Sequence, residues 1–155
     1  MRLSKHFTLE ELVKSATAVK REIVNIPVGP DVENLKRLAA ELEKVRAITG
    51  AFLVVLSGYR CPILNKIVGG SPSSYHMKGL AADFDPPPGF THDAFQHKIA
   101  EFSDIAFDLV LEEEALDGAH WLHFQIAERG QVPRRRLRDA KLDKQGGAIQ
   151  RITAG

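Results

Sequence analysis

The residues best suited to chemistry stand in the stretch SPSSYHMKGLAADFD, residues 71–85, in which His76 precedes Asp83 by seven positions. An imidazole and a carboxylate at this spacing can meet if the chain between them turns back on itself. Gly79 allows such a turn, because a residue without a Cβ can adopt a positive φ angle. Ser74 can hold the same loop through local hydrogen bonds to the backbone. The stretch therefore predicts a loop histidine that folds over a strand aspartate.

A second candidate segment, HWLHF, begins at His120. Side chains alternate along a strand, so His123 shares a face with Trp121 while His120 faces the opposite way. Only one of the two histidines can therefore face His76 and Asp83. Two imidazoles and one carboxylate form a three-ligand zinc site whose fourth tetrahedral position is open to water, which is the arrangement of catalytic zinc.

A run of three glutamates supplies candidates for the base that a zinc-activated water requires. Glu112, Glu113 and Glu114 stand at the end of the expected strand FDLVLEE. Spacing does not select one of them. Both features also have a structural interpretation: a strand histidine is more often a hydrogen-bonded core residue than a ligand, and a glutamate run is more often a solvated strand end.

Alternating helical and strand patterns surround these residues and indicate an α+β fold. The clearest element is a helix from Asp31 to Gly50, whose apolar residues recur at spacings of three and four. Thr8 and Glu11 form a capping box that opens a shorter helix. The other expected elements are strands at 51–57, 80–85, 107–113 and 120–126 and helices at 9–15, 62–68 and 91–102.

Length and charge indicate one domain with a basic extension. A chain of 155 residues with 44% hydrophobic residues can form one core. Lys and Arg (21) nearly balance Asp and Glu (20), so no specific nucleic-acid partner is expected. Residues 129–155 nevertheless carry eight Lys or Arg and two Asp, a local charge of +6. We expect a domain at 1–128 and a basic tail at 129–155 that is partly disordered.

The cysteine count and the apolar runs indicate the cellular compartment in which the protein is made. Cys61 is the single cysteine, so no internal disulfide is possible. The N-terminal residues lack an apolar core of signal-peptide length, and the longest apolar run, Ala51 to Leu56, is too short to cross a membrane. The expectation is a monomer, synthesised in the cytoplasm and not inserted into a membrane.

Four motifs together resemble the peptidase M15 family, which comprises zinc D-Ala-D-Ala carboxypeptidases and phage endolysins. They are SGYRCPILNKIVGG, SYHMKGLAAD, FDLVLEE and WLHF. The residues that match the family signature are Ser74, His76, Gly79, Ala81 and Asp83. The resemblance covers roughly residues 3–126 and implies a small, mostly antiparallel sheet with helices packed around it, as in the hedgehog signalling domain.

The resemblance also implies roles for individual residues. It assigns His76, Asp83 and His123 as zinc ligands and Glu113 as the general base. If the strand were aligned with the family pattern one position earlier, the base would instead be Glu112, and Glu114 is also within reach.

Arg60 resembles the arginine that similar enzymes place against the substrate carboxylate or the developing oxyanion, a task that suits the paired donors of a guanidinium. Its structural alternative is a surface arginine that caps a loop. Cys61 departs from the family, since relatives often have serine there.

The implied activity is hydrolysis of peptidoglycan stem peptides, by a D-Ala-D-Ala carboxypeptidase or an L-Ala-D-Glu-type endopeptidase of phage or prophage origin. Such an enzyme would act on the cell wall after release through a phage lysis pore or delivery within a virion. The alternative is a metal-stabilised wall-binding or virion structural module of the same fold that hydrolyses nothing.

Overall fold

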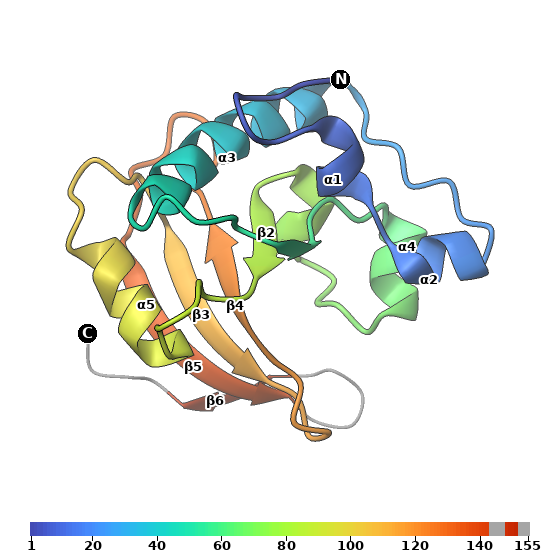
Figure 1. The fold of residues 1–155 in the computed structure, drawn as a ribbon. Helices are drawn as coiled ribbons and strands as arrows, with labels where there is room; N and C mark the ends of the chain where they lie inside the picture. Colours follow the sequence, from blue (N-terminus) through green and yellow to red (C-terminus); the bar gives the residue numbers. More distant parts are fainter. Residues whose placement is uncertain (143–147, 152–155) are drawn as a thin grey trace.

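A mixed β-sheet forms the centre of the computed structural model, which describes residues 1–142 and 148–151 (Figure 1). The strand order is β1-β2-β4-β3-β5-β6. The strands are β1 (Val55–Ser57), β2 (Ala81–Phe84), β3 (Leu109–Glu114), β4 (His120–Gln125), β5 (Arg136–Leu142) and β6 (Ala148–Arg151). The α+β class is confirmed by these strands together with the helices.

The sheet is mixed because β3 and β5 run parallel, while the other neighbouring strands are antiparallel. The expectation of a mostly antiparallel sheet is therefore corrected to a mixed one. The physical reason is that β5 follows a long return connection after β4, which brings it alongside β3 in the same direction.

Helices surround the sheet. They are α1 (Leu9–Val13), α2 (Ala16–Lys20), α3 (Gly29–Ala47), α4 (Pro62–Ile67), the 3₁₀ helix η1 (Tyr75–Lys78) and α5 (His92–Ala100). The capping box at Thr8 and Glu11 is present at the start of α1. The apolar stripe expected on α3 is buried, with Leu35, Leu38 and Leu42 fully inside the core.

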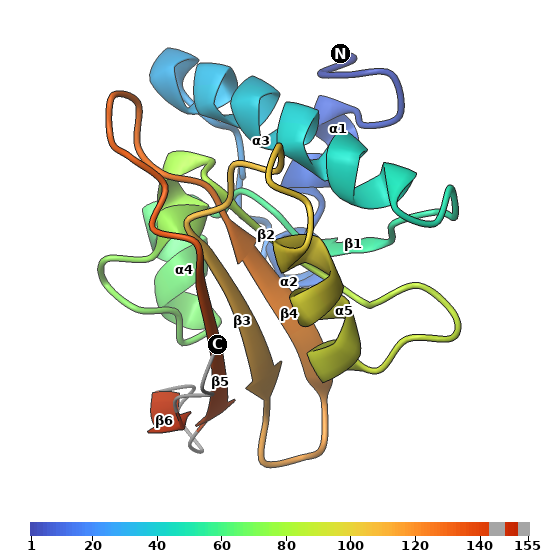
Figure 2. The same ribbon diagram turned by 90° about the vertical axis from the view of Figure 1, so that its left-hand side faces the viewer.

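The two faces of the sheet differ in chemistry. On one face, Phe84, Val110 and Phe124 join the main apolar cluster together with Phe95 of α5. Figures 1 and 2 show α5 against this face of β3 and β4, with α4 on the other side of the sheet. The face turned toward α4 and η1 is the polar one. Strand alternation places Asp83 of β2 on this face, together with His123 and Gln125 of β4.

Three segments differ from the sequence-based expectation. The apolar run at 51–57 forms a strand only at β1, and Phe52 and Val54 before it are exposed. The edge position of β1 explains this, since only one of its sides is paired. The short elements α2 and η1 were not expected from the sequence.

The basic segment after residue 128 contributes to the sheet instead of forming a tail throughout. Strand β5 pairs with β3, and Leu137 belongs to the main apolar cluster. The sequence did not predict β5, because the arginines at alternate positions 134, 136 and 138 resemble a solvated run of charges. Residues 143–147 and 152–155 lie outside the described residues.

Over the part of the chain that the structure describes, every helix is too short or too polar to traverse a lipid bilayer.

Candidate metal centre

Adjacent strands bring two of the expected ligands together on the polar face of the sheet. β2 and β4 pair antiparallel with Asp83 directly opposite His123. Partners that face each other across an antiparallel pair lie on the same side of the sheet. The Asp83 Oδ1 atom lies 3.2 Å from Nδ1 of His123. Strand alternation thus places His123, not His120, beside the aspartate.

The third side chain reaches this face from η1. Ser74 caps η1, and its Oγ accepts a hydrogen bond of 3.2 Å from the backbone N–H of His76. An ion pair between Lys78 and Glu128 ties η1 to the segment that follows β4. The chain leaves η1 through Gly79, whose φ of 71° lies in the left-handed region. The loop therefore folds His76 over β2, as the sequence predicted.

The three side chains form a compact group that fits a divalent cation. His76 Nε2 lies 3.2 Å from Asp83 Oδ1, and one ligand atom from each of His76, Asp83 and His123 lies within 4.8 Å of the others. Two ligands of a tetrahedral ion at about 2.0–2.1 Å would be about 3.3 Å apart, which agrees with the two carboxylate distances. All three residues are buried.

Hydrogen bonds fix which nitrogen of each imidazole is available to a metal. Nδ1 of His76 lies 2.7 Å from the carbonyl oxygen of Gly58. A carbonyl can only accept, so Nδ1 carries the proton and Nε2 presents its lone pair to the group. Nε2 of His123 contacts Oε1 of Gln125 at 3.1 Å, which leaves Nδ1 facing Asp83. Such outer partners are typical of histidines that bind metal.

The electrostatics of the group favour a bound cation. Burial lowers the pKa of His76 and favours the neutral imidazole that a metal needs. Burial alone would raise the pKa of Asp83, but the neighbouring His76 and His123 outweigh it and keep the carboxyl ionised. Burial opposes protonation of His123 too, yet the hydrogen bond to Asp83 and the charges of Asp83 and Glu113 raise its pKa. A cation would replace that proton.

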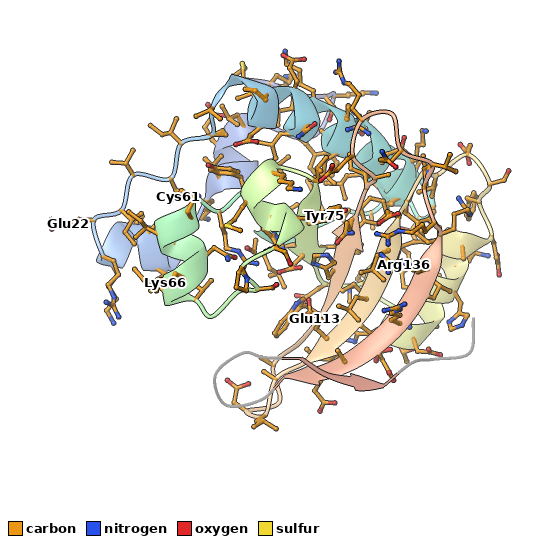
Figure 3. All side chains as sticks on the ribbon, turned by 180° about the vertical axis from the view of Figure 1, so that it is seen from behind. Glu22, Cys61, Lys66, Tyr75, Glu113 and Arg136 are labelled. Carbon is orange, nitrogen blue, oxygen red and sulfur yellow. The ribbon has the colours of Figure 1, made fainter. Side chains whose placement is uncertain are left out.

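Of the three glutamates, Glu113 lies on the polar face beside the group. Its Oε1 is 3.8 Å from Nδ1 of His123 and accepts a hydrogen bond of 3.2 Å from the indole N–H of Trp121. Burial raises the pKa of Glu113. Glu112 faces the other side, where its carboxylate lies 2.9 Å from Nε2 of His120. Figure 3 labels Glu113 on the sheet and Tyr75 of η1.

Arg60 lies near this group. Burial lowers the pKa of its guanidinium, and the negative charges of Asp83 and Glu113 partly oppose that effect. Its backbone N–H donates to the carbonyl of His76 at 3.1 Å, and Nη2 lies 3.5 Å from Oγ of Ser74. Nε is buried and has no hydrogen-bond partner among the described residues. A half-buried guanidinium with an unused donor can bind an incoming anionic group.

The remaining histidines stay outside the group. His120 stacks on His92 with ring centroids 3.6 Å apart, on the face opposite His123. His97 contacts the backbone carbonyl of Asp93 at 2.8 Å. His6 is exposed, and its Nδ1 contacts a carboxylate oxygen of Glu43 at 2.7 Å.

Three residues that support the site, Gly58, Trp121 and Gln125, had no role assigned from the sequence. The period of two along β4 places Trp121 and Gln125 on the face of His123, but it does not indicate what they contact. No local signal marks Gly58, because its carbonyl meets His76 only through the tertiary fold.

Gly79 provides a test of the loop that carries His76. A Cβ at Gly79 would lie 2.6 Å from the carbonyl oxygen of Asp31, in addition to the strain of a positive φ. We expect Gly79→Ala to lower the free energy of unfolding by about 2 kcal/mol or more, measured by urea denaturation. Gly50 is a matched control, since its φ is 72° and nothing lies within 4 Å of the added Cβ. Equal losses in the two variants would contradict the close packing of η1 on α3.

Comparison with known proteins adds one finding. The sequence model of a family described as peptidase M15 matches residues 5–110. Arg60, His76 and Asp83 lie within the matched range, whereas Glu113 and His123 lie just beyond it. The comparison with curated proteins returned no match.

Proposed function

Because the chain belongs to the peptidase M15 family, we propose that it is a zinc metallopeptidase that hydrolyses peptide bonds in the stem peptides of bacterial peptidoglycan. The observation that carries this proposal is the convergence of His76, Asp83 and His123 around one point, with Glu113 beside them. Three protein ligands leave a fourth tetrahedral position for water or substrate, as catalytic zinc requires.

Each residue of the group has a task that follows from its contacts. Nε2 of His76, a carboxylate oxygen of Asp83 and Nδ1 of His123 would hold the ion. A zinc ion supplies Lewis acidity, which polarises a peptide carbonyl and makes water a stronger nucleophile at neutral pH. Gly58 and Gln125 keep the two imidazoles in the required orientation through the hydrogen bonds described above.

Glu113 is the proposed general base. Its place on the same face as His123 supports this choice over Glu112 and Glu114, which alternate to the opposite face. Its carboxylate would accept a proton from the attacking water and deliver it to the leaving amine. The Trp121 indole orients the carboxylate. The raised pKa of Glu113 brings it closer to the pH at which a base of this kind works best.

Arg60 is proposed to bind the substrate carboxylate or the developing oxyanion. Its Nε, which has no hydrogen-bond partner within residues 1–142 and 148–151, and its position near Asp83 and Glu113 support this role. The scissile bond is either a terminal D-Ala-D-Ala bond or an internal L-Ala-D-Glu-type bond. We propose action at the cell wall, by a monomer reaching it through phage lysis or virion delivery.

The proposal is tested by hydrolysis of purified stem peptides with mass-spectrometric detection of the products. Activity is expected to disappear on treatment with a chelator and to return on addition of zinc. If the protein binds zinc tightly but breaks no peptide bond in any stem peptide, it is instead a metal-stabilised wall-binding or virion module.

A further inference from the structure

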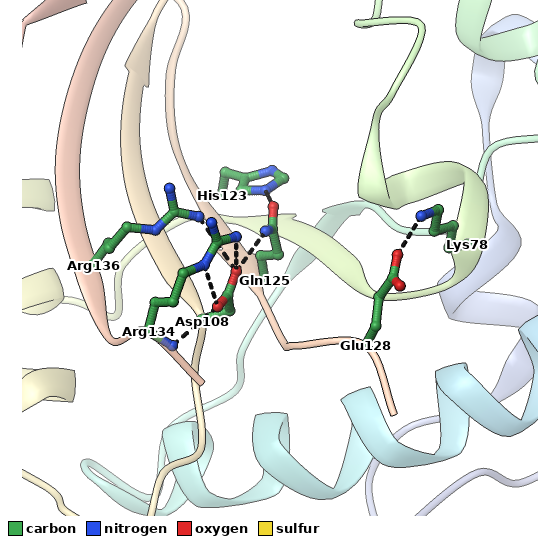
Figure 4. Close-up of polar contacts among 7 residues, drawn as sticks. All are labelled: Lys78, Asp108, His123, Gln125, Glu128, Arg134 and Arg136. Atoms are coloured by element: carbon green, nitrogen blue, oxygen red, sulfur yellow. Dashed lines mark hydrogen bonds and ion pairs between the residues drawn. The ribbon is translucent and has the colours of Figure 1, made fainter. Parts of the chain in front are cut away.

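A chain of polar contacts leads from His123 away from the candidate metal position to the C-terminal part of the protein (Figure 4). Nε2 of His123 lies 3.1 Å from Oε1 of Gln125, and Nε2 of Gln125 donates to Oδ2 of Asp108 at 3.0 Å. Arg134 then donates to both oxygens of Asp108 from its guanidinium, at 3.0 and 2.7 Å. Arg136 adds a contact of 3.3 Å.

The carboxylate at the centre of this chain is held firmly in its ionised form. Asp108 is buried, with 3% of its side chain exposed, whereas 54% of the Arg134 side chain is exposed. The backbone N–H of Arg134 also donates to Asp108, at 3.0 Å. Hydrogen bonds from Arg134 outweigh the effect of burial and hold the pKa of Asp108 well below its usual range.

An ionised carboxylate fixes the direction of every hydrogen bond in the chain. Asp108 can only accept, so the amide NH₂ of Gln125 must face it. The amide oxygen of Gln125 must then face His123, and it too can only accept. His123 must therefore carry a proton on Nε2, which leaves the Nδ1 lone pair for the metal. The orientation of the imidazole is thus set by Asp108, which acts on the ring through Gln125.

We propose that Arg134, acting through Asp108 and Gln125, is a positioning residue that holds His123 in its metal-binding tautomer and orientation. The inference rests on the proposed function, since it presumes a metal at the group. It also assigns a task to a residue of the basic segment 129–155, which lies beyond the range matched by the family model.

The test measures zinc affinity by competition with a chromogenic chelator, without any peptide substrate. Gln125→Met keeps the size of the side chain and removes its acceptor and donor. It is expected to weaken zinc binding by about 10- to 100-fold, the usual effect of losing an outer partner of a metal ligand. Arg134→Ala should weaken it by a smaller factor, because Arg136 still contacts Asp108.

Arg129→Ala is the matched control. It removes the same charge from the same segment, and in the described part of the chain the arginines that contact Asp108 are Arg134 and Arg136. The zinc affinity of Arg129→Ala should equal that of the unmodified protein. The absorption bands of bound Co²⁺ should change in Gln125→Met and Arg134→Ala but not in Arg129→Ala, since these bands report ligand geometry. A purely structural role would lower stability in urea without moving them.

The possible outcomes distinguish failure of the proposed function from failure of the positioning role of Arg134. If the unmodified protein binds neither zinc nor Co²⁺, the proposed function and this inference both fail. If it binds zinc and Arg134→Ala matches Arg129→Ala in affinity and spectrum, the positioning role is wrong while the proposed function stands. Arg134 is half exposed, so this variant decides the question even if Gln125→Met does not fold.

Discussion

Glu113→Gln is expected to lower the turnover of stem peptides by about 10²- to 10⁴-fold while the protein stays folded and still binds zinc. The amide keeps the size of the side chain and can still contact Trp121, but it cannot accept a proton from water. The measurement is kcat on a purified stem peptide, together with zinc content by elemental analysis.

Glu112→Gln is the matched control for this experiment. Glu112 is the preceding residue of the same strand, yet its carboxylate contacts His120 and Gln96 on the opposite face. Its replacement should leave kcat within a few-fold of the unmodified enzyme. The proposed base would be wrong if Glu112→Gln lost activity and Glu113→Gln kept it.

His76→Ala is expected to remove both bound zinc and activity. The substitution deletes one of three ligands, and the remaining pair, Asp83 and His123, cannot hold the ion at the stoichiometry of a three-ligand site. Elemental analysis of the dialysed protein should give about one zinc per chain before the change and close to none after it.

His120→Ala serves as the control for metal content, because His120 stacks on His92 behind the sheet. It should retain zinc. Circular dichroism of the metal-free proteins would show whether His76→Ala keeps the fold despite losing its contact with Gly58. Retention of stoichiometric zinc by folded His76→Ala would remove the basis of the proposed function.

Local periodicity was enough to predict most of what the site requires. The strand pattern of LAADFD placed Asp83 on one face, and the pattern of HWLHF placed His123 and His120 on opposite faces, as the structure has them. The same period applied to β3 places Glu113 and Glu112 on opposite faces, but only the pairing of β3 with β4 shows which of them shares a face with His123. The residues alone therefore left the choice of base open.

Features that depend on distant pairing could not be predicted in this way. The parallel contact of β3 with β5 joins segments separated by a hairpin and a return connection, and nothing in either segment encodes its partner. Arg134 and Arg136 resembled surface charges because their partner, Asp108, is buried 26 and 28 positions earlier in the chain. The run at 51–57 was misinterpreted because apolar composition does not distinguish an edge strand from a central one.

The binding of Asp108 by Arg134 and Arg136 has a consequence for biosynthesis. His76 and Asp83 leave the ribosome well before Arg134 and Arg136, and the parallel strand that carries Arg136 must find β3 across a long stretch of chain. Pairing of this non-local kind is slow. If the group binds a metal as proposed, its full affinity is therefore expected only after the segment that orients His123 has been translated and has paired with β3.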